Sequence, residues 1–495
     1  MNIARFFEHW SIAEDPFRAE EARQDAVFQR LGEPVAHPDF EKIAGDLDNP
    51  STSIVFGEKG SGKTAIRLQI ERRAAQRNVA TPERRVLLTP CDDLNPMLDH
   101  IHAREGGEDV DASLRGVRLV DHMDNVLGVA ATKLTDFALG EDAFSAKAAR
   151  RLSPEQRSDF LLLQAVYDGS EHAPERTRRL RRLLHIRPDA RETVWLLLRW
   201  GGWVFAAAAL GLWMRYGHED AQRLWMWVIL ALAGAWGVVL LKTLVWDALL
   251  LRRVSARLAR QTRALGRSAE TVGASLARAP SRVRRHDLLP LDDVDEHRYA
   301  MFARLRRVAR ALGWESVVVV VDRVDEPTLV SGDTERMRSV IWPLLNNKFL
   351  QMEGVAFKLL LPIELRYALF REASAFFQEA RLDKQNLVER LQWTGSMLYD
   401  LCNARIAACM TPGAKPVALR DLFDDDVTRQ DVIDALDQMR QPRDAFKLLY
   451  RCVQEHCSNV PDEDPKWTIP RLTLESVRKR QVERVEQLMR GVRPG

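Results

Sequence analysis

The octapeptide GEKGSGKT at residues 57–64 has the residue types and the spacing of a phosphate-binding loop, GxxxxGK[ST]. Its glycines let successive backbone N–H groups turn inward around phosphate. Lys63 is expected to reach the β and γ phosphates of a nucleotide, and the Thr64 hydroxyl is expected to ligate Mg²⁺. The predicted nucleotide-binding residues are Gly57, Gly60, Ser61, Gly62, Lys63 and Thr64.

A second chemical pattern is the acidic group that ends the segment WESVVVVVDRVDEP, residues 314–327. Its valine run predicts a central strand of a parallel sheet that is covered on both faces. Asp322 follows at the carboxyl end of that strand, where a Walker B aspartate helps to hold Mg²⁺. Asp325 or Glu326 would orient or deprotonate the attacking water, and we prefer Glu326. The simpler alternative is that the acidic residues of 317–326 only end a buried strand.

These groups need a sheet and helices to position them. The segment STSIVF at 51–56 predicts a strand before the loop, and AIRLQIERRAAQR at 65–77 predicts a helix after it. RRVLLTP at 84–90 predicts a second strand. GVAFKLLLPIEL at 354–365 predicts a strand beside the Walker B strand, with Glu364 as the nearest polar residue to a γ-phosphate sensor position. The expected fold class is α/β, with a mostly parallel sheet.

A helical lid is expected near the C-terminus. In QPRDAFKLLYRCVQEHC, residues 441–457, Pro442 suits the first helical position and Arg443 falls in the opening turn. From there Arg443 could reach a γ-phosphate, although a solvated surface arginine explains it equally well. Four further arginines are candidates for an arginine finger acting on a neighbouring subunit, and the sequence does not choose among Arg366, Arg371, Arg381 and Arg390.

Two long apolar segments lie between the two halves of this site. Residues 194–214 contain one charge, Arg199, and residues 224–241 contain none before the segment continues to 246. At ~1.5 Å per helical residue, each is long enough for a hydrocarbon core of roughly 30 Å. Tryptophans gather near the ends of both segments, where indole rings favour the membrane interface. We therefore expect a two-helix transmembrane hairpin within 193–250; the alternative is a pair of buried helices.

Arginines are concentrated outside the hairpin, whereas its connector, RYGHEDAQR at 215–223, is balanced in charge. This asymmetry predicts that both flanks are cytoplasmic and that the connector lies on the other side of the membrane. Anionic lipid headgroups are the expected partners of the flanking arginines, and the helix 252–267 is expected to lie along the membrane surface. Nucleic acid is a less favoured partner. The flanking arginines are Arg176, Arg178, Arg179, Arg181, Arg182, Arg187, Arg191, Arg252, Arg253, Arg257, Arg260, Arg263 and Arg267.

Composition sets broad bounds on the protein. The chain has 495 residues, of which 46% are hydrophobic and 29% charged, as in a globular protein of several units. Its formal charge of +3 gives no global reason to expect a nucleic-acid partner. The five cysteines form no CxxC pair, which favours a reducing compartment over a disulfide framework. The first residues do not resemble a secretory signal.

Thr64 and Asp322 are 258 positions apart, far more than one or two βα units require. With the hairpin inside this interval, the chain resembles the KAP family of P-loop NTPases, relatives of STAND and AAA+ ATPases. VVVVVDRVDE resembles that family's strand with DxxD, although Arg323 and Glu326 depart from the commoner choices. QPRDAFKLLY resembles its C-terminal Pro-Arg element, which implies a sensor role for Arg443. Bacterial members include phage-exclusion proteins, which implies antiviral defence.

Other bacterial AAA-type ATPases, of the origin-recognition and secretion-associated kinds, are a rival resemblance. In those proteins, segments similar to EDPF at 14–17 help to hold the adenine.

The resemblance and the motifs together predict an ATP hydrolase that uses ATP and Mg²⁺, tethered to the cell inner membrane by two spans with its ATPase domain in the cytoplasm. One alternative is a nucleotide-binding signalling scaffold with little turnover, and another is a nucleic-acid-dependent AAA+-type ATPase. A homo-oligomer is one option for its assembly. The expected organisation is an N-terminal cap and first part of the P-loop core in 1–110, a helical insert in 111–192, the hairpin in 193–250, a basic return helix and linker in 251–296, the second part of the core in 297–384, and a helical lid with a C-terminal extension in 385–495.

Overall fold

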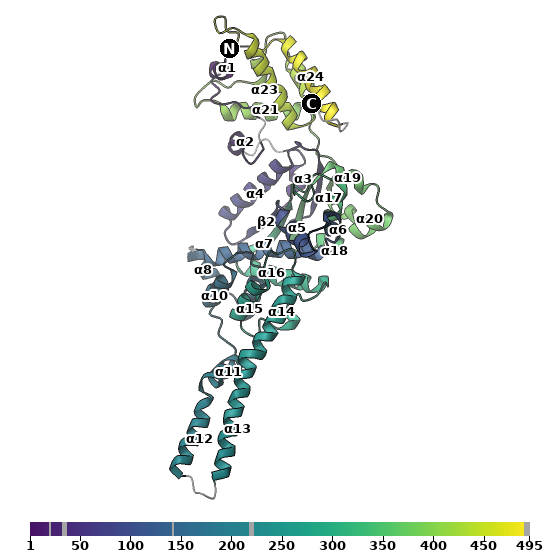
Figure 1. Cartoon of the computed structure of the whole chain (residues 1–495). Helices are drawn as coiled ribbons and strands as arrows, with labels where there is room; N and C mark the ends of the chain where they lie inside the picture. Colours follow the sequence, from purple (N-terminus) through teal and green to yellow (C-terminus); the bar gives the residue numbers. More distant parts are fainter. Residues whose placement is uncertain (19–20, 32–36, 141–142, 217–221, 490–495) are drawn as a thin grey trace.

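The centre of the molecule is a parallel five-stranded sheet with strand order β2-β3-β4-β1-β5. The computed structural model describes residues 1–18, 21–31, 37–140, 143–216 and 222–489 (Figure 1). The strand predicted at 354–365 lies between the Walker B strand and the P-loop strand, pairing with both. The strands are β1 (Ser53–Gly57), β2 (Arg85–Cys91), β3 (Trp314–Val321), β4 (Val355–Pro362) and β5 (Asn386–Val388).

The valine run of β3 is apolar throughout because both of its faces are covered, as predicted. Val318 and Val320 point into a core shared with α3 (Phe40–Ala44) and α4 (Lys63–Ala80). Val317, Val319 and Val321 point the other way, into the largest core of the protein. Side chains alternate across a strand, so a strand with helices on both faces needs an apolar residue at every position.

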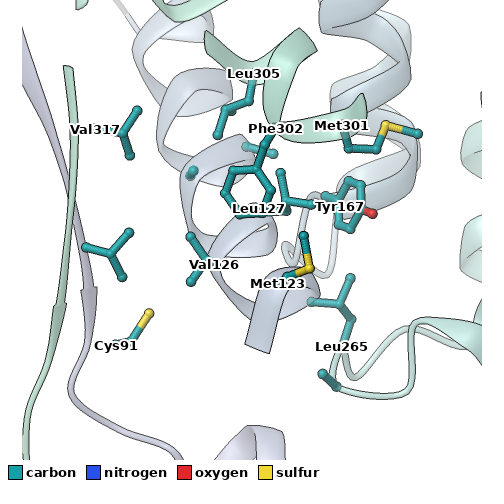
Figure 2. Close-up of a cluster of buried hydrophobic side chains, with 14 of the residues drawn as sticks. Cys91, Met123, Val126, Leu127, Tyr167, Leu265, Met301, Phe302, Leu305 and Val317 are labelled. Carbon is teal, nitrogen blue, oxygen red and sulfur yellow. The ribbon is translucent and has the colours of Figure 1, made fainter. Parts of the chain in front are cut away.

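The second face of the sheet is covered by helices from the interval between the two chemical motifs. Figure 2 shows this core, in which Met123, Val126 and Leu127 of α7 (Leu119–Leu139) gather with Val317 of β3 and Phe302 of α16 (Asp295–Ala311). Further helices on this side are α5 (Asn95–Arg104), α6 (Val110–Arg115), α8 (Ala143–Arg150), α9 (Pro154–Tyr167), α10 (Ala173–Leu183), α15 (Ala269–Arg278), α17 (Thr334–Ile341), α18 (Asn347–Leu350), α19 (Ile363–Leu369) and α20 (Ser374–Ala380).

A separate helical core lies at the end of the molecule that holds both chain termini (Figure 1). Phe6, Phe7 and Phe17 are buried in it together with residues of the C-terminal helices. The aromatic residues of the expected N-terminal cap therefore pack with the C-terminal unit. β5 likewise belongs to the sheet, although it falls within 385–495. The helices are α1 (Ile3–His9), α2 (Ala26–Arg30), α21 (Gly395–Cys409), α22 (Arg429–Asp437), α23 (Pro442–Asn459) and α24 (Arg471–Met489).

A helical hairpin projects from the opposite end (Figure 1). Its first arm is α11 (Ala190–Gly201) followed by α12 (Trp203–Tyr216), and the two are bent by 45°. The second arm is α13 (Gln222–Leu240), a π-helical turn (Leu241–Trp246) and α14 (Asp247–Gln261). Residues 217–221 of the connector lie outside the described part of the chain. Short 3₁₀ turns elsewhere are His286–Leu288, Trp342–Leu344, Leu382–Lys384 and Leu419–Leu422.

The hairpin contains one helix that is long and apolar enough to cross a membrane, 223–261, or two if the bent pair is one span. None of the apolar window of that helix is buried within the protein. The segment 194–214 differs from the continuous span expected, because it breaks at Gly201 and Gly202. A Cβ on Gly202 would lie 2.5 Å from Cδ1 of Trp236, so only glycine permits this approach of the two arms.

The helix after the hairpin does not follow the predicted course along a membrane surface. α14 continues the helix that begins at Arg223 and enters the layer behind the sheet, where Ser255, Leu258 and Ala259 are buried. The arginines that follow bind protein groups: Arg263 pairs with Asp121 at 2.8 Å, and Arg267 donates to two main-chain oxygens at 2.7 Å. The buried face of α14 packs against α15.

Candidate functional site

The loop at 57–64 connects β1 to α4 at the carboxyl edge of the sheet, in the strand-loop-helix order predicted. Gly60 and Gly62 have φ of 97° and 96°, in the left-handed region that other residues rarely enter. Ser61 is buried, and its hydroxyl has no hydrogen-bond partner among the described residues. The loop therefore surrounds a space with polar groups that a phosphate could satisfy.

Lys63 is folded back on the loop. Its Nζ donates to the carbonyl oxygens of Gly57 at 2.7 Å and Glu58 at 3.0 Å. Burial lowers the pKa of Lys63, while the nearby carboxylates of Asp322 and Asp325 act in the opposite direction. A phosphate in the loop would give this buried ammonium a stronger partner than two carbonyl oxygens.

Thr64 and Asp322 meet across the carboxyl edge of the sheet. The Thr64 hydroxyl donates to Oδ2 of Asp322 at 3.0 Å, although 258 positions separate the two residues. Burial raises the pKa of Asp322, and the Thr64 hydrogen bond opposes that shift. A hydroxyl and a carboxylate at this separation are the protein ligands that a P-loop nucleotide site supplies to Mg²⁺.

Arg67 is a further member of this group that the sequence analysis missed. It lies one turn after Thr64 on α4 and is 2% exposed. Its Nε is 3.6 Å from Oδ2 of Asp322, and its Nη1 is 2.5 Å from Oδ2 of Asp92, the residue after β2. Arg67 thus draws together the ends of β2 and β3. The available signal was a charged residue among the inward-facing positions of α4, directly after Ile66 and one turn before Ile70.

Asp325 and Glu326 both line the cavity beside the loop. Glu326 is paired with Arg323, whose Nε lies 2.7 Å from its Oε2. Arg323 also binds Glu21 of the N-terminal segment at 2.5 Å, and its backbone has φ of 61°. The carboxylate preferred as the catalytic base is therefore held by an arginine in this structure, whereas the Asp325 side chain makes no ion pair with a described residue.

The C-terminal helical unit forms the opposite wall of the cavity. Pro442 is the first residue of α23, as predicted, and this start places Arg443 against the P-loop. A Cβ on Gly60 would lie 3.0 Å from Cβ of Arg443. Among the described residues, the Arg443 guanidinium has no hydrogen-bond or ion-pair partner. Its charge lowers the pKa of Lys63 further, so two cations line one cavity.

Contacts with Glu58 and Ser61 join the loop to this wall. Glu58 binds Arg390 and the amide of Gln441. The indole Nε1 of Trp393 donates to the Ser61 carbonyl at 2.8 Å. The second residue of the loop therefore contacts the C-terminal helical unit directly.

The four arginines considered as fingers have different surroundings. Arg390 binds Glu58 of the loop, Arg366 pairs with Glu389 at 2.7 Å, and Arg381 pairs with Asp383 at 3.3 Å. Arg371 is exposed and has no ion pair with a described residue. Glu364, considered as a sensor, is exposed, and its negative charge acts to raise the pKa of Lys63.

The cavity has a volume of about 470 Å³, and part of its lining is aromatic. The rings of His37 and Trp393 meet edge to face at 4.9 Å, and Phe28 and Phe446 also line this part. Burial lowers the pKa of His37, which favours its neutral form. A flat heterocycle could stack in such surroundings.

Residues 14–17, associated by resemblance with adenine, do not line this cavity. Phe17 is buried in the C-terminal core, and the Pro16 carbonyl accepts a hydrogen bond from Arg405 at 2.6 Å. Arg405 in turn pairs with Asp25, which does line the cavity, at 2.6 Å. Residues 14–17 thus contact the cavity wall indirectly, through Arg405 and Asp25.

The residues present fit a nucleoside triphosphate with Mg²⁺. The left-handed glycines and the unpaired Ser61 hydroxyl suit phosphate oxygens, and the cations Lys63 and Arg443 suit its charge. In the described part of the chain there is no group of three or more His, Cys, Asp or Glu side chains that would hold a metal without such a ligand. Mg²⁺ commonly binds with one or two protein ligands together with substrate phosphates, so Thr64 and Asp322 suffice.

Comparison of the chain with models of known protein families, with curated proteins and with solved structures gave no match. The resemblance to the KAP family accordingly remains a prediction from the motifs and from their order along the chain.

Proposed function

We propose that this protein is an ATP hydrolase anchored in a membrane by its helical hairpin. The observation that carries the proposal is the hydrogen bond between Thr64 and Asp322 at the mouth of the P-loop, in the cavity that also contains Lys63. A buried strand that merely ended in acidic residues would not need its first carboxylate to bind the threonine of a phosphate-binding loop.

Each residue then has a definite task. The loop N–H groups and Lys63 bind the β and γ phosphates, and Thr64 with Asp322 would hold Mg²⁺. The metal, when bound, neutralises charge on the phosphate oxygens. Glu326, or Asp325 beside it, orients and deprotonates the attacking water, and Arg443 binds the γ-phosphate from the C-terminal wall. The choice of ATP over GTP depends on the AAA-like resemblance and on the sequence having no NKxD motif.

The exposed surface of the hairpin supports membrane insertion. Nearly all exposed large hydrophobic side chains of the described chain lie between 194 and 250; the exceptions are Val79, Val294, Tyr367, Phe370 and Leu472. An apolar surface of this extent is costly in water and stable in a bilayer. With the arginine-rich flanks on the cytoplasmic side, the hairpin crosses the inner membrane twice and the ATPase part faces the cytoplasm. The role that the resemblance implies is a conformational switch in phage defence.

The ion pair between Arg323 and Glu326 favours a second candidate, a nucleotide-gated switch with little basal turnover. In that case ATP binds and the chain waits for a trigger that frees Glu326. A nucleic-acid-dependent ATPase has no comparable observation in its favour.

ATP turnover by the full-length protein in lipid nanodiscs tests the proposal. Lys63→Ala should abolish nucleotide binding, and Glu326→Gln should abolish turnover while leaving binding intact. Matched controls are Lys384→Ala and Glu335→Gln, which change exposed side chains outside the cavity. Turnover that survives both site substitutions would refute the assigned roles. ATP binding without turnover in the parent protein would favour the switch. Recovery of the protein in the soluble fraction without detergent would refute membrane insertion.

A further inference from the structure

A second cavity lies at the base of the hairpin. Figure 1 shows this region, where the hairpin meets the helices behind the sheet. Its volume is about 840 Å³. One wall is α11, the second is the π-helical turn with the start of α14, and the third is the end of α15 with the loop that follows. π-helical turns are rare and are often found at functional sites.

This base cavity is strongly cationic. Both of its carboxylates already have protein partners: Glu192 accepts from the Ser281 N–H at 2.7 Å and from Arg284 at 3.2 Å, and Asp247 accepts from Lys242 at 2.9 Å. Five basic groups against two acidic ones leave an excess of three positive charges. The basic residues are Arg181, Arg191, Arg199, Lys242 and Arg284.

Two of these cations have no partner in the described part of the chain. Neither Arg191 nor Arg199 makes a hydrogen bond or ion pair through its guanidinium, and Arg199 has only the ring of Trp200 at 5.7 Å. Arg199 is also the single charge of the apolar segment 194–214. A guanidinium beside a lipid-facing surface is costly without a counter-ion, so these positions call for an anion.

Apolar side chains form another part of the lining and indicate where the cavity lies relative to the bilayer. Leu196, Leu251 and Val254 line it, and Trp195 carries the Lys242 ammonium 4.2 Å from its ring centre. Around this base, Trp200 and Trp246 are 70% and 59% exposed. Indole rings gather at the level of lipid headgroups, so this base cavity would sit at the cytoplasmic interface of the bilayer.

We propose that the base cavity binds the headgroup of an anionic phospholipid with two phosphate groups, whose acyl chains lie along the hairpin. Two unpaired guanidiniums offer one fork of donors to each phosphate, and Arg181, which donates to main-chain oxygens, supplies the third positive charge. Basic cavities between membrane helices on the cytoplasmic side are suited to such headgroups. The proposal depends on the membrane insertion proposed above.

Lipid binding to the full-length protein in a neutral detergent tests this assignment. Cardiolipin, which has two phosphates, is titrated and the bound lipid is counted by native mass spectrometry, with phosphatidylglycerol as the single-phosphate comparison. The variant Arg191→Gln/Arg199→Gln should weaken cardiolipin binding at least about tenfold, because two charge-assisted hydrogen-bonding groups are lost. The matched control is Arg151→Gln/Arg310→Gln, which removes the same charge from exposed residues that neither line the cavity nor flank the hairpin. Its affinity should stay within about threefold of the parent.

Three results would overturn the assignment. Equal losses in the two double variants would mean general attraction between the positive charge of the protein and anionic lipid. Equal affinity for cardiolipin and phosphatidylglycerol would remove the two-phosphate specificity. Displacement of the lipid by millimolar inorganic pyrophosphate would identify a site for a soluble anion. Failure of membrane insertion itself would be recognised separately, since the protein would then remain soluble without detergent.

Discussion

Release of Glu326 from Arg323 should raise ATP turnover. The ion pair joins two partly exposed groups, with side chains 20% and 50% exposed, at 2.7 Å. Pairs of this kind stabilise by ~0.2–1 kcal/mol, so breaking one should increase the fraction of free Glu326 by about 1.4- to fivefold. If Glu326 activates water, kcat should rise by the same factor at saturating ATP.

Arg323→Asn is the appropriate substitution because residue 323 has φ of 61°, and asparagine tolerates this left-handed conformation. Arg440→Asn is the matched control: Arg440 has φ of 60°, is exposed, and does not line the cavity. Steady-state phosphate release in nanodiscs gives kcat for the parent and both variants. The gain from Arg323→Asn should disappear in a Glu326→Gln background.

A fall in kcat for Arg323→Asn, with Arg440→Asn unchanged, would refute this reasoning. Arg323 would then assist the reaction itself, and the pair with Glu326 would belong to a resting state of no kinetic importance. An equal change in both variants would show that the effect comes from net charge or backbone strain.

Two further predictions concern nucleotide affinity and stability. Gly60→Ala should raise the Kd for a fluorescent ATP analogue about tenfold, because the new Cβ would meet Arg443 in a backbone conformation of φ 97°. Gly413→Ala is the control: Gly413 has φ of 87° and open surroundings, so the Kd should not change. Equal effects of the two substitutions on the Kd would exclude the contact with Arg443 as the cause. Burial lowers the pKa of His122 below its ordinary value of about 6.5, so as the pH falls the unfolded chain binds a proton at this residue before the folded chain does. The free energy of unfolding should therefore decrease below about pH 6.5, by up to ~1.4 kcal/mol per pH unit from this residue. Melting curves at pH 7, 6 and 5 should show a smaller loss for His122→Gln than for the parent, with exposed His172→Gln as the control; identical pH dependence in all three would contradict it.

The sequence predicted the core elements well where local chemistry is strongly constrained. The five valines of 317–321 could only suit a strand buried on two faces, and the glycine spacing of 57–64 required a particular loop. The helix start at Pro442 was likewise readable, because the preference for proline at the first helical position depends on local sequence. The Thr64–Asp322 contact followed from the rule that parallel strands share one functional edge.

Contacts between distant segments could not be predicted in the same way. The pairing of Arg323 with Glu21, and of Glu58 with Arg390, depends on how the N-terminal and C-terminal segments lie over the sheet. The burial of Phe17 with the C-terminal helices has the same origin. Apolar periodicity shows that a face is covered, but it does not show which segment covers it. For that reason four of the five strands were predicted, whereas the packing of the N-terminal cap against the C-terminal helices was not.

The position of the hairpin between the two motifs has a structural explanation in the layer behind the sheet. Its second arm continues as α14, and the loop that follows places Leu265 against α7, where a Cβ on Gly128 would lie 2.7 Å from the leucine Cδ2 (Figure 2). α7 packs on β2 and on α16, α16 packs on β3, and Asp322 is the residue after β3. The insert thus supplies the cover that a two-faced strand requires, and the hairpin extends from that cover. A shift of β3 on nucleotide binding would reach the hairpin through packed side chains, and closely packed layers transmit small displacements.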